Sequence, residues 1–206
     1  LDPRLPVSQV LAEPLRVWNK GNQLEIDAKI DELLTAVNLD PTVVRDRRSY
    51  EFFGGQCQRI SIARSLALDP TMIICDEPVS ALDVSVQARL LDLIRSLVAQ
   101  TGLSIVIVTH DLAVVSEMCD HINVMYAGRI VESAGKSDLF RQPLHAYTRS
   151  LLKSIPASHP KGELLYTIPG LPPDLLEVRL PAKMPSLPVQ VVMAEPGTQA
   201  APPAAP

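Results

Sequence analysis

The sequence predicts an α/β fold with a mostly parallel sheet and flanking helices. Two apolar runs of strand length, Met72–Cys75 and Ser104–Thr109, are separated by a long amphipathic stretch with helical periodicity. Parallel strands that are covered on both faces are almost continuously apolar, and a helix is the usual connection between them. Residues 71–109 are therefore expected to form a strand, a helix and a second strand, the unit from which a doubly wound sheet is built.

Two helices are predicted upstream of this unit. Residues 24–37 place apolar side chains on one helical face among charged ones, and Pro41 is expected to close that helix. A second helix should follow the glycine pair Gly54-Gly55 and end at Asp69-Pro70. The predicted inward-facing residues are Ile26, Ile30, Leu33, Leu34 and Val37 in the first helix and Ile60, Ala63, Leu66 and Ala67 in the second.

The long helix between the two strands has a defined start and stop. Asp83 suits its N-cap, and Gly102 suits its C-terminal end because glycine readily adopts the left-handed conformation found there. Its apolar stripe is predicted to comprise Val86, Leu90, Ile94, Leu97 and Val98. Further along, the pattern predicts a short helix over 112–119, a strand pair over 122–126 and 129–132 that turns at Ala127-Gly128, and a helix over 145–155.

Composition excludes several classes of protein. With 206 residues, 47% hydrophobic and 20% charged, the chain is expected to form one globular domain with appendages. A net charge of −4 gives no general attraction to nucleic acid or anionic lipid, so no nucleic-acid partner is expected. The three cysteines have no metal-like spacing, and no apolar run approaches the roughly 20 residues needed to cross a bilayer. We therefore expect no direct membrane insertion, and any link to a membrane should pass through another protein.

Both ends of the sequence are unusual. The chain starts with Leu1-Asp-Pro-Arg, as though it began inside a larger protein, and we expect it to be a fragment. At the other end, 12 of the 19 prolines lie in residues 156–206. That segment is expected to be a Pro-rich extension, extended or largely disordered.

Two acids follow directly after the first predicted strand. Asp76 and Glu77 would lie at the carboxyl edge of the sheet, where α/β proteins hold their ligands. One carboxylate can organise Mg²⁺ and the other can polarise a water. Because the pair follows Gly54-Gly55 and precedes His110, the order indicates a nucleotide-hydrolysing site. Taken alone, the acids are also compatible with a solvated strand end.

The phosphate-cradling loop G-x-x-x-x-G-K-[ST] is missing from the sequence. Gly135-Lys136-Ser137 matches the end of that pattern, but Ile130 stands where its first glycine is required. No long buried strand is predicted to run directly into a long helix there. We therefore expect the chain to contain only part of a nucleotide site.

Four segments together resemble the ATP-binding subunits of ABC transporters. Glu51-Phe-Phe-Gly-Gly-Gln56 resembles their L-S-G-G-Q signature loop, and Asp76-Glu77 resembles the end of their Walker B strand. Ser80-Ala-Leu-Asp83 matches their D-loop, and His110 is similar to their switch histidine. The four appear in the family's order and spacing, and the resemblance runs from about Leu1 to Ile155.

The resemblance implies a role for each of these residues. Asp76 would hold Mg²⁺ through water, Glu77 would be the general base for the attacking water, and His110 would contact the γ-phosphate of ATP. A histidine at a strand end can instead be a structural hydrogen-bonding group. Asp83 would couple the two ATP sites of a dimer, a role compatible with that of a helix N-cap.

The signature loop departs from the family at two positions, Phe53 and Cys57, the second of which stands where a basic residue is usual after Gln56. Gly54, Gly55 and Gln56 would bring backbone N–H groups to the γ-phosphate of a nucleotide held on a partner chain, although the glycines alone could simply form a turn. Phe53 replaces the serine whose hydroxyl donates to that phosphate. Loss of one charge-assisted bond, of roughly 1.5–3 kcal/mol, is therefore expected to impair the loop.

The C-terminal part resembles one branch of the family. Pro143–Leu152 and Ile168–Pro173 are similar to the extension found in importers of oligopeptides, dipeptides and nickel. That extension usually continues with a cysteine-containing stretch, but no cysteine follows Cys119, so no metal or cluster is expected there.

The resemblance also implies a domain plan. Residues 1–155 would be the C-terminal part of an ABC ATPase domain, an incomplete P-loop NTPase fold without the Walker A and Q-loop region. The expected subdivisions are a helical subdomain over about 5–65, a core from the Walker B strand to the H-loop over 66–132, C-terminal helices over 137–155 and the Pro-rich extension over 156–206. In the family, a further strand lies between the strand that ends at His110 and the one at 122–126. The chain alone is therefore expected to be unstable or prone to aggregate, because backbone groups facing that gap would be unpaired.

The implied function is ATP-driven peptide import. The expected partners are a second ATPase subunit, in a homodimer or heterodimer, and transmembrane permease subunits. The expected location is the cytoplasmic face of the cell membrane, as a peripheral protein. A non-catalytic partner subunit that offers its signature face to another ATPase is the alternative. An ABC-type DNA-repair ATPase is disfavoured by the missing coiled coil, the missing zinc cysteines and the acidic balance.

Overall fold

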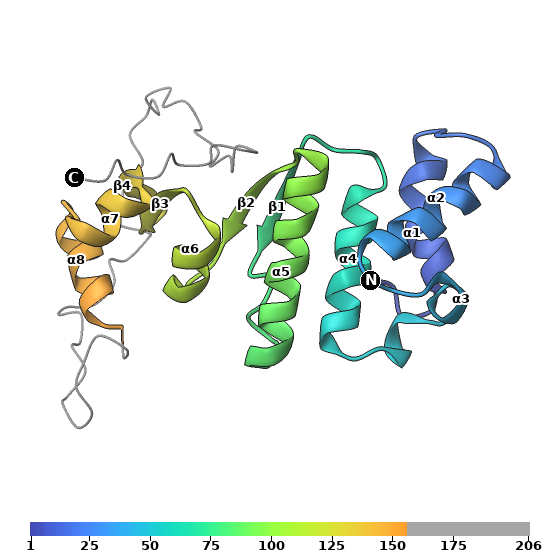
Figure 1. Ribbon diagram of the computed structural model, residues 1–206, viewed down its shortest axis with the longest axis horizontal. Coiled ribbons are helices and arrows are strands. Elements are labelled where there is room, and N and C mark those ends of the chain that lie inside the picture. The colour runs from blue at the N-terminus through green and yellow to red at the C-terminus, as the bar shows by residue number, and fades with distance from the viewer. Residues whose placement is uncertain (156–206) are drawn as a thin grey trace, which may run out of the picture. The chain divides into compact units, whose positions relative to one another are not determined.

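The computed structural model describes residues 1–155, which divide into two compact units at the Val108–Thr109 boundary (Figure 1). The predicted Pro-rich extension lies outside the described residues, and the predicted subdivision of residues 1–155 stays a prediction. The first unit contains α1 (Val7–Val17), α2 (Gln23–Ala36), α3 (Pro41–Val44), a 3₁₀ turn (Ser49–Glu51), α4 (Gly54–Leu66), β1 (Met72–Asp76), α5 (Val84–Thr101) and β2 (Ser104–Val108). The second contains α6 (Leu112–Met118), β3 (His121–Tyr126), β4 (Arg129–Gly135), α7 (Lys136–Arg141) and α8 (Ala146–Lys153).

Helices α1, α2 and α4 pack against one another, and α4 also contacts α5 (Figure 1). The predicted inward faces of α2 and α4 are confirmed. Their central side chains, Ile30, Leu34 and Ile60, are fully buried together with Leu11 of α1. The start of α2 is fixed by a capping box, in which the Asn22 side chain accepts from the Glu25 N–H and the Glu25 carboxylate accepts from the Asn22 N–H.

The predicted stop of α2 at Pro41 is wrong. The helix ends at Ala36, and Asn38 reverses the chain with a positive φ of 56°. The Leu39 N–H then donates to the Leu34 carbonyl oxygen at 2.9 Å, which closes the helix end. Pro41 instead occupies the first position of α3, where the missing N–H costs nothing.

The predicted strand–helix–strand unit is confirmed. β1 pairs with β2 in parallel, from Met72 opposite Ser104 to Asp76 opposite Val108. The connecting helix α5 begins after the Asp83 cap and ends at Gly102, whose φ is 69°. The buried residues of α5 are Leu90, Leu91, Leu93, Ile94 and Leu97, whereas Val86 and Val98 of the predicted stripe are half-buried.

Two sequence-based expectations about the sheet are corrected. The described residues form a parallel pair, β1–β2, and a separate antiparallel pair, β3–β4, rather than a mostly parallel sheet. β1 is also not covered on both faces. In the described part it has one strand neighbour, and Ile74 is 66% exposed while Val108 at the end of β2 is 47% exposed. The β1–β2 pair therefore presents an apolar face to solvent.

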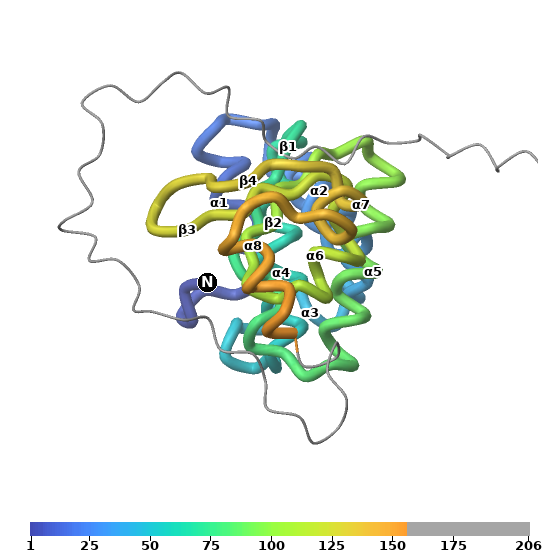
Figure 2. Tube along the Cα trace, turned by 90° about the vertical axis from the view of Figure 1, so that its left-hand side faces the viewer, coloured from blue at the N-terminus to red at the C-terminus, as the bar shows by residue number. Residues whose placement is uncertain are grey.

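The second unit is built on the β3–β4 hairpin, with α7 packed against both strands (Figure 2). The predicted turn is confirmed: Ala127 and Gly128 have φ values of 49° and 74°, as the two central residues of a tight hairpin turn require. β4 continues to Gly135, beyond the predicted end at Glu132. The small core consists of Val115, Ile122, Val124 and Leu139.

The Glu132 side chain connects β4 to the start of α8. Its Oε1 accepts from the Leu144 N–H at 2.7 Å and its Oε2 accepts from the His145 N–H at 3.0 Å. Desolvation alone would raise the pKa of Glu132, but the Thr148 hydroxyl, the two backbone N–H groups and the nearby His145 together outweigh it and hold the pKa below its usual value. The sequence pattern did not single out this residue.

Replacing Glu132 with glutamine is expected to loosen α8. The side-chain amide of the variant lacks the charge that the two N–H groups stabilise, and a hydrogen bond to a charged acceptor contributes about 1 kcal/mol more than one to a neutral acceptor. Because the pKa of Glu132 is lower in the folded protein than in the unfolded chain, its carboxylate stabilises the start of α8 above the unfolded pKa of about 4.3. This stabilisation is lost as the pH falls through the folded pKa. Hydrogen exchange of the α8 amides at pH 7 should therefore be about fivefold faster in Glu132→Gln. The difference should vanish at low pH, and a difference that is independent of pH would contradict the assignment.

Among residues 1–155, none of the helices combines the length and the apolar character that crossing a bilayer requires.

Candidate active site

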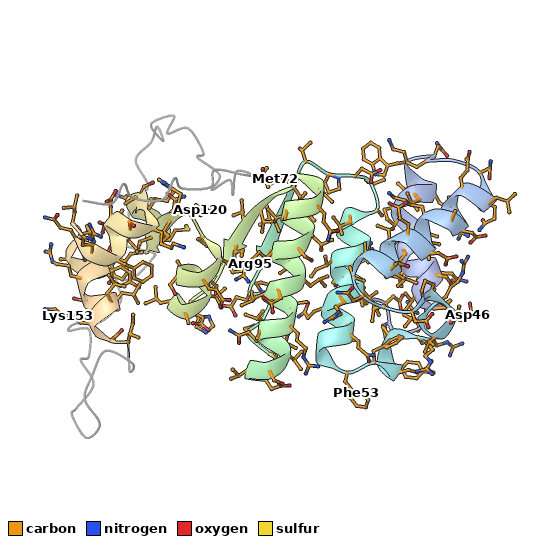
Figure 3. The ribbon with its side chains drawn as sticks, in the orientation of Figure 1. Asp46, Phe53, Met72, Arg95, Asp120 and Lys153 are labelled. Carbon is orange, nitrogen blue, oxygen red and sulfur yellow. The ribbon has the colours of Figure 1, made fainter. Side chains whose placement is uncertain are left out.

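The two acids lie at the C-terminal end of β1. Asp76 is the last residue of the strand, its side chain is exposed, and Glu77 follows it. Figure 3 shows Met72, at the start of β1, and Phe53, just before α4, at opposite ends of the first unit.

Glu77 has an unusual backbone. Its φ is 43°, in the left-handed region that side chains other than glycine rarely adopt. It also precedes Pro78, a position that favours extended geometry. The Glu77 N–H donates to the Val108 carbonyl oxygen at 2.8 Å, so the ladder between β1 and β2 continues one residue beyond Asp76. Backbone strain of this kind is concentrated at functional sites.

The loop from Glu77 to Asp83 is closed by local hydrogen bonds. The Ser80 N–H and the Ser80 hydroxyl both donate to the Glu77 carbonyl oxygen, at 3.4 Å and 3.2 Å. The Asp83 carboxylate accepts from the Ser85 hydroxyl at 2.7 Å and the Val86 N–H at 3.0 Å, and these bonds hold the pKa of Asp83 below its usual value. The predicted N-cap role of Asp83 is thus confirmed.

The glycine pair at the start of α4 lies against this loop. A Cβ atom on Gly54 would lie 3.0 Å from Leu82 Cδ2, and one on Gly55 would lie 2.4 Å from Val86 Cγ1. Neither glycine is needed for a positive φ, so what requires glycine here is the close approach of α4 to Leu82 and Val86. The signature-like segment and the first turn of α5 are therefore in direct contact.

Phe53 occupies the N-cap position of α4 without forming a side-chain cap. Its carbonyl oxygen accepts from the Gln56 N–H at 2.8 Å, but its ring is 86% exposed and projects into solvent (Figure 3). The side chain thus leaves the first N–H groups of α4 without the hydroxyl acceptor that a serine would supply.

His110 follows the end of β2 and belongs to the second unit. It is exposed and lies between Thr109 and Asp111, whose backbone N–H donates to the Thr109 hydroxyl at 3.0 Å. The Asp111 carboxylate caps α6 by accepting from the Ala113 N–H at 2.8 Å. The predicted site residues at the start of α4, at the end of β1 and in the following loop thus belong to the first unit, and His110 belongs to the second.

The described residues offer one carboxylate, that of Asp76, to a magnesium ion whose remaining ligands would be phosphate oxygens and water. They contain no group of three or more histidine, cysteine or acidic side chains that could enclose a metal. Mg²⁺ in nucleotide sites is usually bound by one or two carboxylates together with phosphate oxygens and water, so a single exposed carboxylate such as Asp76 suffices from the protein side.

The sequence pattern does not predict three contributors to this arrangement, which are the Ser80 hydroxyl, Leu82 and the Val108 carbonyl. Their contacts with Glu77 and Gly54 depend on how the loop folds back, which no spacing in the sequence reports.

Comparison with known proteins gives consistent results. Residues 1–80 match the family model described as "ABC transporter", and residues 131–180 match that of the "Oligopeptide/dipeptide transporter, C-terminal region". The chain is 43% identical to the oligopeptide transport ATP-binding protein OppF of Escherichia coli (strain K12) over 183 residues, which are 88% of this chain and 53% of that protein. It is 42% identical to OppF of Haemophilus influenzae, over the same shares of the two chains. A putative peptide import ATP-binding protein of Brucella ovis is 45% identical over 160 residues, 78% of this chain and 50% of that one. The chain thus spans about half the length of the curated relatives it matches.

Proposed function

This chain belongs to the ATP-binding protein family of ABC transporters, in its oligopeptide-transporter group, and from that premise we propose that it is part of an ATP-hydrolysing subunit that energises peptide import. The described residues would be part of an incomplete P-loop NTPase fold, in which a longer protein supplies the phosphate-cradling loop. Experiments on the whole protein therefore use this chain within a protein of its relatives' length, which is called the full-length protein below.

Each acid of the β1 end has a separate role in this proposal. Asp76 would hold Mg²⁺, which when bound neutralises charge on the phosphates. Glu77 would accept a proton from the attacking water as the water oxygen bonds to the γ-phosphorus. The bond from that phosphorus to its bridging oxygen breaks, and ADP and inorganic phosphate are the products. The strained, fixed backbone of Glu77 supports this role, since positioning a base is the main task of the protein in phosphoryl transfer.

The start of α4 would act on a nucleotide held by a second ATPase subunit. The N–H groups of Gly54, Gly55 and Gln56 lie at a helix N-terminus, which favours a phosphate oxygen. Asp83, on the loop that contacts these glycines, would couple the two sites of the dimer. His110 would contact the γ-phosphate, the role that its position after β2 has in the resemblance to the family. The transmembrane permease subunits would be the further partners, and the proposed location is the cytoplasmic face of the membrane, as a peripheral subunit.

One observation carries this proposal: Asp76 ends a parallel strand, Glu77 follows it, and the loop after them contacts the glycines at the start of α4. The test is peptide uptake into vesicles that contain permease subunits, the full-length protein and a second ATPase subunit. Uptake should require ATP and should stop with a non-hydrolysable analogue. Uptake at the same rate without ATP would exclude the proposal.

A second candidate is a non-catalytic subunit that only offers its signature face, and Phe53 is the residue that favours it. Replacing Phe53 with serine supplies both an N-cap and a hydroxyl for the γ-phosphate. If the proposed signature role is correct but impaired, ATP hydrolysis by the full-length assembly should rise at least about tenfold, which corresponds to the lower end of one charge-assisted bond. Phe53→Ala is the control, because it removes the ring and adds no hydroxyl. Equal rates of ATP hydrolysis for the parent, Phe53→Ser and Phe53→Ala would refute the hypothesis that Phe53 impairs the signature loop.

A further inference from the structure

The backbone at Glu77 must be held in place by its neighbours. A residue with a side chain is disfavoured at a φ of 43°, and the residue before a proline is disfavoured outside the extended region. Glu77 meets both conditions. Its conformation therefore persists only where surrounding contacts impose it.

Three hydrogen bonds meet at the Glu77 backbone. The Glu77 N–H donates to Val108, and the Glu77 carbonyl oxygen accepts from the Ser80 N–H and from the Ser80 hydroxyl. Two of these bonds join backbone groups, which almost any sequence could form. The bond from Ser80 Oγ is the exception, because it depends on the side chain, and at 3.2 Å it is shorter than the 3.4 Å bond from the Ser80 N–H.

The segment that carries Ser80 is itself fixed. Val79 is buried, the Leu82 N–H donates to the Val79 carbonyl oxygen at 3.1 Å, and Leu82 lies against Gly54. The Ser80 hydroxyl thus connects Glu77 to a loop that is anchored at the start of both α4 and α5.

We propose that Ser80 is a positioning residue, whose hydroxyl locks the left-handed backbone of Glu77 and thereby sets the direction in which the carboxylate leaves the chain. The direction of a side chain from the backbone is set by φ and ψ, so a return of Glu77 to the extended region would redirect its carboxylate. This inference rests on the proposed function only where it calls that carboxylate a catalytic base.

The first test measures the backbone and does not depend on catalysis. Hydrogen exchange of the Glu77 amide, whose N–H is bonded to Val108, is compared in the full-length protein and its Ser80→Ala and Ser80→Thr variants. Loss of one neutral hydrogen bond should speed exchange by about three- to tenfold in Ser80→Ala, and Ser80→Thr should restore the parent rate because it keeps the hydroxyl. Ser65→Ala is the matched control: the exposed Ser65 hydroxyl donates to the Ser61 carbonyl within α4 and does not reach Glu77. Unchanged exchange in Ser80→Ala would overturn the proposal.

The second test separates positioning from the proposed chemistry. With the base misdirected, Ser80→Ala should lower kcat for ATP hydrolysis by a similar three- to tenfold factor and leave KM for ATP unchanged, and Ser80→Thr should restore kcat. If exchange rises but kcat does not fall, while Glu77→Gln is inactive, Ser80 does not position the base. If Glu77→Gln itself retains hydrolysis, the proposed function of Glu77 is wrong, and the exchange result alone decides whether Ser80 holds its backbone.

Discussion

Replacing Glu77 with glutamine is expected to slow ATP hydrolysis by the full-length assembly by about 10²- to 10⁴-fold, the usual contribution of a positioned general base. Glutamine keeps the shape of the side chain but cannot accept the proton of the attacking water. ATP binding should persist, because the phosphate-cradling loop and Asp76 are unchanged. The measurement is single-turnover hydrolysis beside equilibrium binding of a fluorescent nucleotide.

A matched control for this change lies on the same unit. Asp92→Asn also converts a carboxylate to an amide, and Asp92 forms an exposed ion pair with Arg95 within α5. Such a pair contributes little to stability, so hydrolysis should stay within about twofold of the parent. Comparable rates of ATP hydrolysis for Glu77→Gln and Asp92→Asn would show that Glu77 is not the general base.

Replacing Gly55 with alanine is expected to destabilise the first unit by about 1–3 kcal/mol, the usual cost of an extra methyl group in a packed contact. The added Cβ would lie 2.4 Å from Val86 Cγ1, closer than atoms can approach, so α4 or α5 must shift. Val86 is β-branched and its side chain has little freedom to move aside. The thermal midpoint of the full-length protein should fall by about 2–4 °C for each kcal/mol.

Two further variants show whether this contact is the cause. Val86→Ala removes the methyl groups that collide, so the cost of Gly55→Ala should be much smaller in the Val86→Ala background. Gly135→Ala is the control glycine, since it also lies at the start of a helix, as the N-cap of α7, has an ordinary φ of −61°, and its nearest neighbour would lie 3.9 Å from the new Cβ. An equal cost of Gly55→Ala in both backgrounds would mean that the strain arises elsewhere.

The helices could be predicted from sequence where local signals agree. In α2 and α4 an apolar face repeats at helical spacing, and in α5 the Asp83 cap and Gly102 mark both ends. The stop of α2 failed because Asn38 adopts a left-handed conformation that the sequence pattern does not report, and the more obvious Pro41 begins a helix instead.

The sheet could be predicted only in part. The apolar run Met72–Cys75 correctly indicated a strand with a parallel partner, because such runs are typical of strands covered on both faces. A run of that kind shows that both faces need cover but not which segment provides it, and in the described part Ile74 has none.

The candidate site shows the same limit. The spacing of the glycine pair, the two acids and Asp83 was enough to select them as candidate site residues. Their roles in the family remain proposals. The left-handed Glu77 backbone and the Ser80 bond could not be predicted, because they follow from how the chain folds back between β1 and α5. Glu132 was missed for a related reason: it lies in a strand far along the sequence from Leu144 and His145, and no local pattern connects them.

The uncovered side of the β1–β2 pair makes the segment around Asp76 depend on cover from elsewhere. Burying Ile74 and Val108 would contribute about 1.5–3 kcal/mol for each side chain, a large share of the net stability of a small domain. Without such cover, the exposed apolar side chains near Asp76 would be expected to attract chaperones and proteases in a cell.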